Sequence, residues 1–153
     1  MELDCPEMAL EKVARLVDNA GARPVGLRLR AEILVRLNRC TEALADIEEV
    51  RPHETNLDWL DLREAWCRKR LDDLPAAIRC MERLLARSRR SAIGHYNLAC
   101  YLALLGDKPR AVDSLSIACG IEPRFCAEAA RDEDLRALHG EPGFEDLIAE
   151  RGD

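Results

Sequence analysis

The segment AVDSLSIA, residues 111–118, carries the pattern that decides the fold, because three other segments repeat it at intervals of 34 residues. Each copy begins with an alanine and an aliphatic residue, and apolar residues follow four and seven places after the alanine. These spacings put the apolar positions on one face of a helix, where the small alanine lets another helix approach closely. A fixed period of this length indicates one supersecondary unit copied in tandem. The four alanines are Ala9, Ala43, Ala77 and Ala111.

The composition agrees with an all-α protein. The chain has 153 residues, of which 48% are hydrophobic and only 4% aromatic. Leucine and alanine dominate, and both are strong helix formers. The net charge of −6 argues against a protein held to nucleic acid by phosphate contacts. The charge is uneven, because residues 58–91 carry nine basic and six acidic side chains whereas the segments before and after them are net acidic.

Features of targeting and of membrane proteins are lacking in the sequence. No segment approaches the ~20 apolar residues that a membrane helix needs. The start, MELDCPEMALEK, is acidic and lacks the basic-then-apolar layout of a signal peptide. We therefore expect a cytoplasmic protein that does not associate with membranes.

The seven cysteines form no C-x-x-C pair, which a zinc site usually contains. In a cytoplasmic protein they are expected to be reduced thiols that act as small hydrophobes. The sequence thus predicts that all seven are unpaired and that no metal is bound. Cys119 and Cys126, seven residues apart, are the pair that we single out for a test.

Turn residues divide the chain into helices of about 12–14 residues that are joined by short turns, as in stacked helical hairpins. Near the C-terminus the pattern breaks, because Asp132, Glu133 and Asp134 stand where an ordinary repeat would be apolar. Terminal repeats of solenoids carry such a polar outer face. We expect one domain, 1–153, made of a lone helix 6–19, three repeats 24–57, 58–91 and 92–124, and a capping segment 125–150.

The stretch 92–123, AIGHYNLACYLALLGDKPRAVDSLSIACGIEP, resembles a tetratricopeptide repeat (TPR), whose pattern is W-x2-L-G-x2-Y, then A-x3-F, then P. The stretch 24–55 is similar, and 58–89 matches well only in its second half. The resemblance implies a right-handed superhelix, an α-solenoid of about three TPR units. The matching positions in 92–123 are His95, Leu98, Ala99, Leu102, Ala111, Leu115, Ala118 and Pro123.

The middle repeat departs most from the family. Asp61, Glu64 and Arg68 fall at positions where buried apolar residues belong. The segment instead shows two apolar stripes, so either the helix is rotated, or one stripe packs while the other faces the groove. The stripes are Trp59, Leu62 and Trp66, and Leu60, Cys67 and Leu71.

In proteins of the TPR family the first helix of each hairpin lines a concave groove that binds a peptide. The corresponding residues here include arginines and tryptophans, which are enriched at binding hot spots; the tryptophans can equally be core residues. The lining implied by the resemblance is Arg28, Glu32, Arg36, Trp59, Leu62, Arg63, Trp66, Lys69, Tyr96, Asn97, Cys100 and Ala103. One subgroup clamps the carboxylate of chaperone tails with lysine and asparagine, but Glu32 and Ile93 do not fit that clamp, so we do not expect this ligand.

Catalytic motifs are missing, including the phosphate-binding glycine loops, H-E-x-x-H and G-x-S-x-G. We therefore expect no enzyme and no cofactor, but a module or adaptor that binds a peptide or protein in the groove. One alternative is a bacterial secretion-type chaperone with three TPR units. A second is a thiol- or metal-dependent site protein that uses Cys100, Cys119 or Cys126. We also expect a possible homodimer through an apolar strip on the first helix, formed by Met8, Val13 and Val17.

Overall fold

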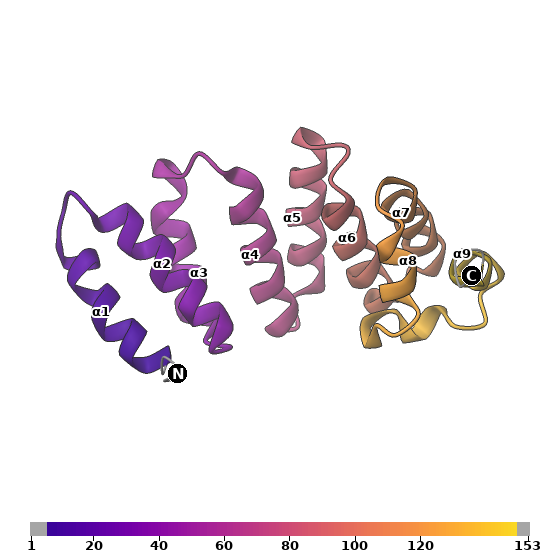
Figure 1. Cartoon of the computed structure of the whole chain (residues 1–153), viewed down its shortest axis with the longest axis horizontal. Coiled ribbons are helices and arrows are strands. Elements are labelled where there is room, and N and C mark those ends of the chain that lie inside the picture. Colours follow the sequence, from indigo (N-terminus) through magenta and orange to yellow (C-terminus); the bar gives the residue numbers. More distant parts are fainter. Residues whose placement is uncertain (1–5, 150–153) are drawn as a thin grey trace. The chain divides into compact units, whose positions relative to one another are not determined.

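The computed structural model describes residues 6–149, which fold into helices joined by short turns without any strand in that range (Figure 1). The predicted all-α class and helical-repeat fold are therefore confirmed. The helices are α1 (Pro6–Asp18), α2 (Arg23–Arg36), α3 (Cys40–Val50), α4 (Leu57–Arg70), α5 (Leu74–Arg87), α6 (Ala92–Leu105), α7 (Lys108–Ile121), α8 (Arg124–Ala129) and α9 (Pro142–Ala149), with short 3-10 helices η1 (Arg51–His53) and η2 (Glu133–Leu138).

The chain divides into two compact units, an N-terminal unit of residues 1–73 and a C-terminal unit of residues 74–153. In the N-terminal unit, α2 packs against both α1 and α3, and α3 against α4. In the C-terminal unit, α6 packs between α5 and α7, while α8, η2 and α9 close over α7.

Three of the four repeated alanines lie in the core, and Ala9 is partly buried. Ala43, Ala77 and Ala111 are each 0% exposed. The residues four places after them, Ile47, Met81 and Leu115, are buried as well. The 34-residue pattern therefore marks the buried face of α3, α5 and α7.

The polar residues of the middle repeat lie inward, so α4 is not rotated to expose them. Asp61 is buried, and the Glu64 side chain is largely buried. Glu64 accepts a hydrogen bond of 2.7 Å from Arg51 Nη2, and Arg68 Nε lies 3.6 Å from Glu64 Oε1. A buried carboxylate keeps its charge only with partners of this kind. Leu60, the residue before Asp61, is buried in the hydrophobic cluster that contains Val50 and Trp59.

The apolar strip predicted on the first helix does not form. Val13 and Val17 are buried in the core cluster that includes Leu27 and Ile47. Of the three predicted residues only Met8 is exposed. The prediction was wrong because α2 covers this face of α1, which the sequence reading had left without a partner.

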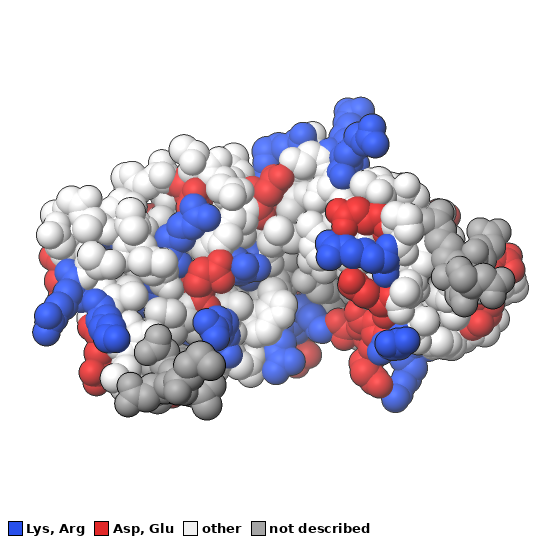
Figure 2. Space-filling view, in the orientation of Figure 1, with Lys and Arg blue, Asp and Glu red and all other residues white. Residues whose placement is uncertain are grey.

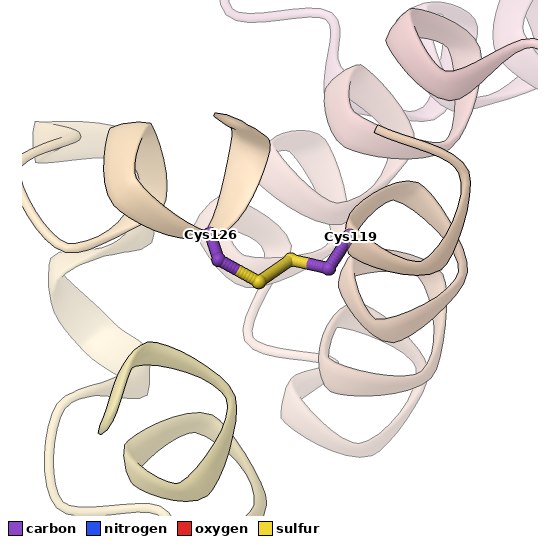
Figure 3. The surroundings of a disulfide bond; sticks show 2 residues. All are labelled: Cys119 and Cys126. Carbon is purple, nitrogen blue, oxygen red and sulfur yellow. A yellow bond between two sulfur atoms is a disulfide. The ribbon is translucent and has the colours of Figure 1, made fainter. Parts of the chain in front are cut away.

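The cysteines are not all unpaired, contrary to the prediction. Cys119 and Cys126 form a disulfide that ties the end of α7 to α8 (Figure 3). The tight turn between these helices brings the two Cα atoms within 5.4 Å, a separation that a disulfide can span. The other described cysteines are buried and take part in no disulfide: Cys40, Cys67, Cys80 and Cys100. Burial raises the pKa of Cys67 to about 12, which keeps this thiol protonated; Cys5 lies outside the described residues.

The close approach of α1 and α2 depends on Gly26. A Cβ atom at this position would lie 2.7 Å from the Val17 backbone nitrogen and 2.8 Å from the Leu16 carbonyl carbon. Backbone atoms cannot move aside as a flexible side chain can. The hairpin therefore needs a residue without a side chain at position 26.

We predict that Gly26→Ala lowers the free energy of unfolding by ~1–3 kcal/mol, because the added methyl group overpacks the hairpin. Urea denaturation would measure it. The matched control is Gly120→Ala in α7, where a Cβ meets nothing within 4 Å. The control should be neutral or stabilising by up to ~1 kcal/mol. Equal effects of the two substitutions would contradict the close-approach argument.

Candidate functional site

Four of the predicted groove residues meet on one face of the N-terminal unit, where α2 lies beside α4. Glu32 of α2 is the centre of the group. Trp59 Nε1 donates a hydrogen bond to Glu32 Oε1. Arg63 Nε donates to both Glu32 carboxylate oxygens at 3.0 Å. One carboxylate thus orients two side chains that the resemblance assigned to ligand binding.

Arg28 completes the network from the other side of Trp59. Its guanidinium carbon lies 4.6 Å from the centre of the Trp59 ring, a cation–π contact. Its Nη1 atom donates a 2.8 Å hydrogen bond to Glu54 Oε2, whose side chain is almost fully buried. We call these five residues, Arg28, Glu32, Glu54, Trp59 and Arg63, the α2–α4 network.

The network changes how Trp59 can act. Trp59 is only 8% exposed, its ring is covered by Arg28 and its N–H group is held by Glu32. The indole is therefore a mostly buried support for the polar groups around it. The side chains of Arg28, Glu32 and Arg63 remain about one third exposed, between 32% and 40%. A ligand would meet these charged groups before it met the tryptophan.

The remaining predicted residues of the N-terminal unit lie at different depths. Arg36 is exposed, whereas Leu62 and Lys69 are partly buried. Trp66 is partly buried and packs against the core cluster of Leu34, Cys40, Ala43 and Cys67. Its ring also lies 5.6 Å from the Arg70 guanidinium. Contact of any of these residues with a ligand stays a prediction.

In the C-terminal unit the cap covers two of the predicted groove residues. Tyr96 and Cys100 are buried, and Asn97 is partly buried. The Tyr96 ring stacks on Phe125 of α8 with 4.6 Å between centroids, and its hydroxyl donates a 2.7 Å hydrogen bond to Asp132 Oδ2. A cavity of about 420 Å³ remains beside this contact; it is lined by Tyr96, Ala127, Glu128, Arg131 and Asp132.

The same contact brings the thiol of Cys100 near two carboxylates. The ligand atoms of Cys100, Asp132 and Asp134 all lie within 4.8 Å of one another. Asp132, however, already caps η2 by accepting a 2.9 Å hydrogen bond from the Asp134 backbone N–H. The arrangement is thus that of a helix cap that also receives the hydroxyl of Tyr96.

A second cavity, of about 510 Å³, lies in the N-terminal unit and was not predicted from the sequence. Its floor is an ion pair in which Arg30 donates to both oxygens of the buried Asp46, at 2.7 and 2.6 Å. The repeat gave no clear signal, because the residues three places after the alanines include the buried Asp46 and the exposed Lys12. The lining is Leu10, Glu11, Ala14, Arg30, Leu34, Arg39, Glu42, Ala45 and Asp46.

Tyr96 makes the stability of the C-terminal unit depend on pH. Burial, and next the hydrogen bond to Asp132, raise the pKa of the Tyr96 phenol far above its ordinary value of 10.0. A group whose pKa is raised on folding stabilises the fold fully below its unfolded pKa and loses that contribution as the pH rises above it. Stability should therefore fall at alkaline pH.

We predict that the free energy of unfolding drops between about pH 9 and pH 11 more steeply for the wild type than for Tyr96→Phe, which cannot ionise. Chemical denaturation across this range would measure the two slopes. Tyr101 is retained in both proteins, so the difference between them reports Tyr96 alone. Parallel slopes would show that Tyr96 is free to ionise in the fold.

Comparison with solved structures finds the same fold in MamA. A crystal structure of MamA matches with a TM-score of 0.75 and 14% identity, over 98% of this chain and 91% of that one. MamA from residue 41 onward, from Desulfovibrio magneticus RS-1, matches with a TM-score of 0.69 and 16% identity, over 97% and 88%. At these identities the likeness concerns the fold alone.

No protein family and no curated protein sequence matches the chain. Within residues 6–149, no helix combines the length and the apolar character that crossing a membrane requires.

Proposed function

We propose that this chain is a TPR protein without enzymatic activity that binds a peptide or protein segment on the α2–α4 face of its N-terminal unit. The observation that carries the proposal is the α2–α4 network, in which internal partners hold exposed charged groups in place. Arg63 is fixed by Glu32, and Arg28 by Glu54 and the Trp59 ring. Arginine is a frequent hot-spot residue at protein interfaces.

Preorganisation is the physical reason why such a network favours binding. Ordering a long side chain at an interface costs about 0.5–1.5 kcal/mol, and an arginine that is already held in place avoids much of this cost. The remaining donors of Arg28 and Arg63 can then meet a carboxylate of the ligand. Leu62 and Trp66 lie on α4 with Arg63, and their partly exposed side chains offer apolar contact to the ligand. The ligand that fits is a segment with both acidic and apolar side chains.

The net charge of residues 58–91 gives this preference only limited support. Residues 58–91 are net basic, but five of their nine basic side chains belong to α5 and the turn after it, outside this face. The acidic preference therefore rests on Arg28, Arg36, Arg63 and Lys69. No observation favours the secretion-type chaperone or a thiol- or metal-dependent site over the interaction module.

We predict that Arg63→Ala weakens partner binding while it leaves the helical signal nearly unchanged, because the Arg63 side chain is partly exposed and, in this proposal, contacts the ligand. Pull-down from the source cell with quantitative mass spectrometry would identify the partner and compare the variants. Arg136→Ala, in the exposed part of the C-terminal unit, is the control for lost charge. Unchanged recovery of every partner with Arg63→Ala would contradict the proposed face.

Trp66→Ala separates the two interpretations of the tryptophan stripe. A tryptophan that binds the ligand loses binding and keeps stability, whereas a core tryptophan loses ~3–5 kcal/mol of stability. If Trp66→Ala has the second effect, the apolar part of the proposed face is wrong and the arginines alone remain.

We further propose that the chain pairs with a second copy through its first hairpin, at residues other than the predicted strip. Leu16 is 36% exposed, whereas the residues at the same repeat position, Val50, Leu84 and Ala118, are at most 2% exposed. Val50 packs in one cluster with Trp59 and Leu60 of α4, and Leu84 lies against Gly94 of α6, so the helix that follows covers this position. Val25 and Leu29 of the adjacent α2 are also exposed, so the first hairpin leaves apolar side chains that a second hairpin can cover.

We predict that Leu16→Asp removes concentration-dependent association, because a carboxylate cannot be buried without a partner. Sedimentation velocity at several concentrations would measure it. The control is Ile117→Asp in the C-terminal unit, where the apolar side chain is 47% exposed; it should leave association unchanged. A wild-type monomer at all concentrations would refute the pairing.

A further inference from the structure

The cavity of about 510 Å³ in the N-terminal unit is separate from the α2–α4 face. Its walls come from α1 and α3, and we call it the α1–α3 cavity. Arg30 lines it from α2 and stands two residues away from both Arg28 and Glu32. Two residues turn an α-helix by about 200°, so Arg30 lies on the opposite side of α2 from those two residues. The volume is within the range of roughly 300–1,000 Å³ that small-molecule sites occupy.

The space between α1 and α3 is left by small side chains. Ala14 of α1 and Ala45 of α3 both line the cavity, and both are exposed. Leu10 and the buried Leu34 add apolar surface to the lining. The cavity thus offers apolar walls to a ligand. The later repeats carry polar residues at the position of Ala14, namely Glu48, Glu82 and Ser116.

Two ion pairs in the lining neutralise each other's charge. Arg30 donates to both carboxylate oxygens of Asp46. Arg39 donates from Nε and Nη2 to the two carboxylate oxygens of Glu42, at 2.6 and 2.5 Å. Each guanidinium is therefore matched by one carboxylate. Acidic and basic side chains are likewise interspersed on the face of the N-terminal unit that Figure 2 shows.

Glu11 of α1 adds a third carboxylate to the lining, which holds only two guanidiniums. The Glu11 side chain is exposed. The basic residues nearest to it along α1, Lys12 and Arg15, do not line the cavity, and among the described side chains neither forms an ion pair with Glu11. The wall formed by α3 has four acidic and no basic side chains. The α1–α3 cavity is therefore net negative beside its apolar walls.

We propose that the α1–α3 cavity binds a small organic cation, a primary ammonium group carried on an apolar body. The ammonium group would lie beside Glu11, and the body would lie against Leu10, Ala14 and Ala45. An ammonium is a compact charge with three N–H donors, which a free carboxylate can accept. The proposal does not depend on the α2–α4 face.

The charges of the lining disfavour other ligands with the same apolar body. An anion would compete with Asp46 and Glu42 for guanidiniums that each already donate two hydrogen bonds. It would also meet the like charge of Glu11, which opposes binding. A neutral amphiphile has no attraction to that carboxylate beyond a neutral hydrogen bond, which is weaker than a charge-assisted one.

The test titrates three compounds with one common body into the full chain at pH 7, followed by isothermal titration calorimetry. The compounds are 4-phenylbutylamine, 4-phenylbutan-1-ol and 4-phenylbutanoate. Ala45→Leu fills the cavity, and its matched control is Ala86→Leu, at an exposed alanine of α5. Glu11→Gln removes the carboxylate, and its matched control is Glu48→Gln, at an exposed acidic residue of α3. Circular dichroism would verify that every variant stays folded.

We expect the amine to bind more tightly than the alcohol, and the alcohol more tightly than the carboxylate. Ala45→Leu should weaken binding of the amine at least about tenfold, because the added carbon atoms occupy the space of the ligand. Glu11→Gln should weaken it about two- to fivefold, as is typical of a solvent-exposed ion pair. Both control variants should bind the amine as the wild type does. Arg63→Ala should do so as well, which separates this cavity from the α2–α4 face.

Several results would overturn the proposal. Absence of amine binding, or binding of the alcohol or the carboxylate at least as tight as that of the amine, would show that the cavity does not select a cation. Equal effects of Ala45→Leu and Ala86→Leu would place the bound amine elsewhere. Amine binding that weakens as the protein concentration rises would show that a second copy of the chain fills the cavity instead.

Discussion

The fold depends on how closely helices can approach at the repeated small residues. Ala43, Ala77 and Ala111 have no exposed surface, and Gly26 leaves no room for even one methyl group. Where helices come this close, dispersion contacts along both backbones add up and little space remains for adjustment. The larger apolar residues four places after each alanine fill the space beside the contact. Each hairpin thus has one permitted packing, and its outward faces are fixed as a consequence.

On those outward faces the carboxylates decide which arginines are held in place. Glu32 and Glu54 hold the arginines of the α2–α4 network, and Asp46 holds Arg30 beneath the cavity of the N-terminal unit. An arginine held in this way is a directional donor in a fixed position.

Much of the fold can be predicted from the sequence, because the residues that recur every 34 positions are those that the repeated helices bury. The period predicted the helical class and the buried alanines, which need only local spacing. It could not show that α2 covers Val13 and Val17, because that depends on how two helices pack. The Cys119–Cys126 disulfide was missed for a similar reason, since the sharp turn between α7 and α8 brings the two thiols together.

The sequence identified residues of the candidate site but not how deeply each of them is buried. The resemblance selected Glu32, Trp59 and Arg63, which the structure brings into contact, but gave no sign that Glu32 would take the indole N–H and leave Trp59 buried. Residues 58–91 are net basic, yet five of their nine basic side chains belong to α5 and the turn after it. Charge counted along a sequence does not say which face of a hairpin carries it.

The cap then limits where a ligand can bind. The Cys119–Cys126 disulfide fixes α8 to α7, and α8 carries Phe125, which stacks on Tyr96. Asp132 accepts the Tyr96 hydroxyl just beyond that helix. The aromatic ring that the family pattern assigns to ligand contact is thus occupied by the chain's own cap. In the described part of the N-terminal unit, the side chains of Arg28, Glu32 and Arg63 stay partly exposed. A ligand of the kind proposed therefore has its best-ordered donors on α2 and α4.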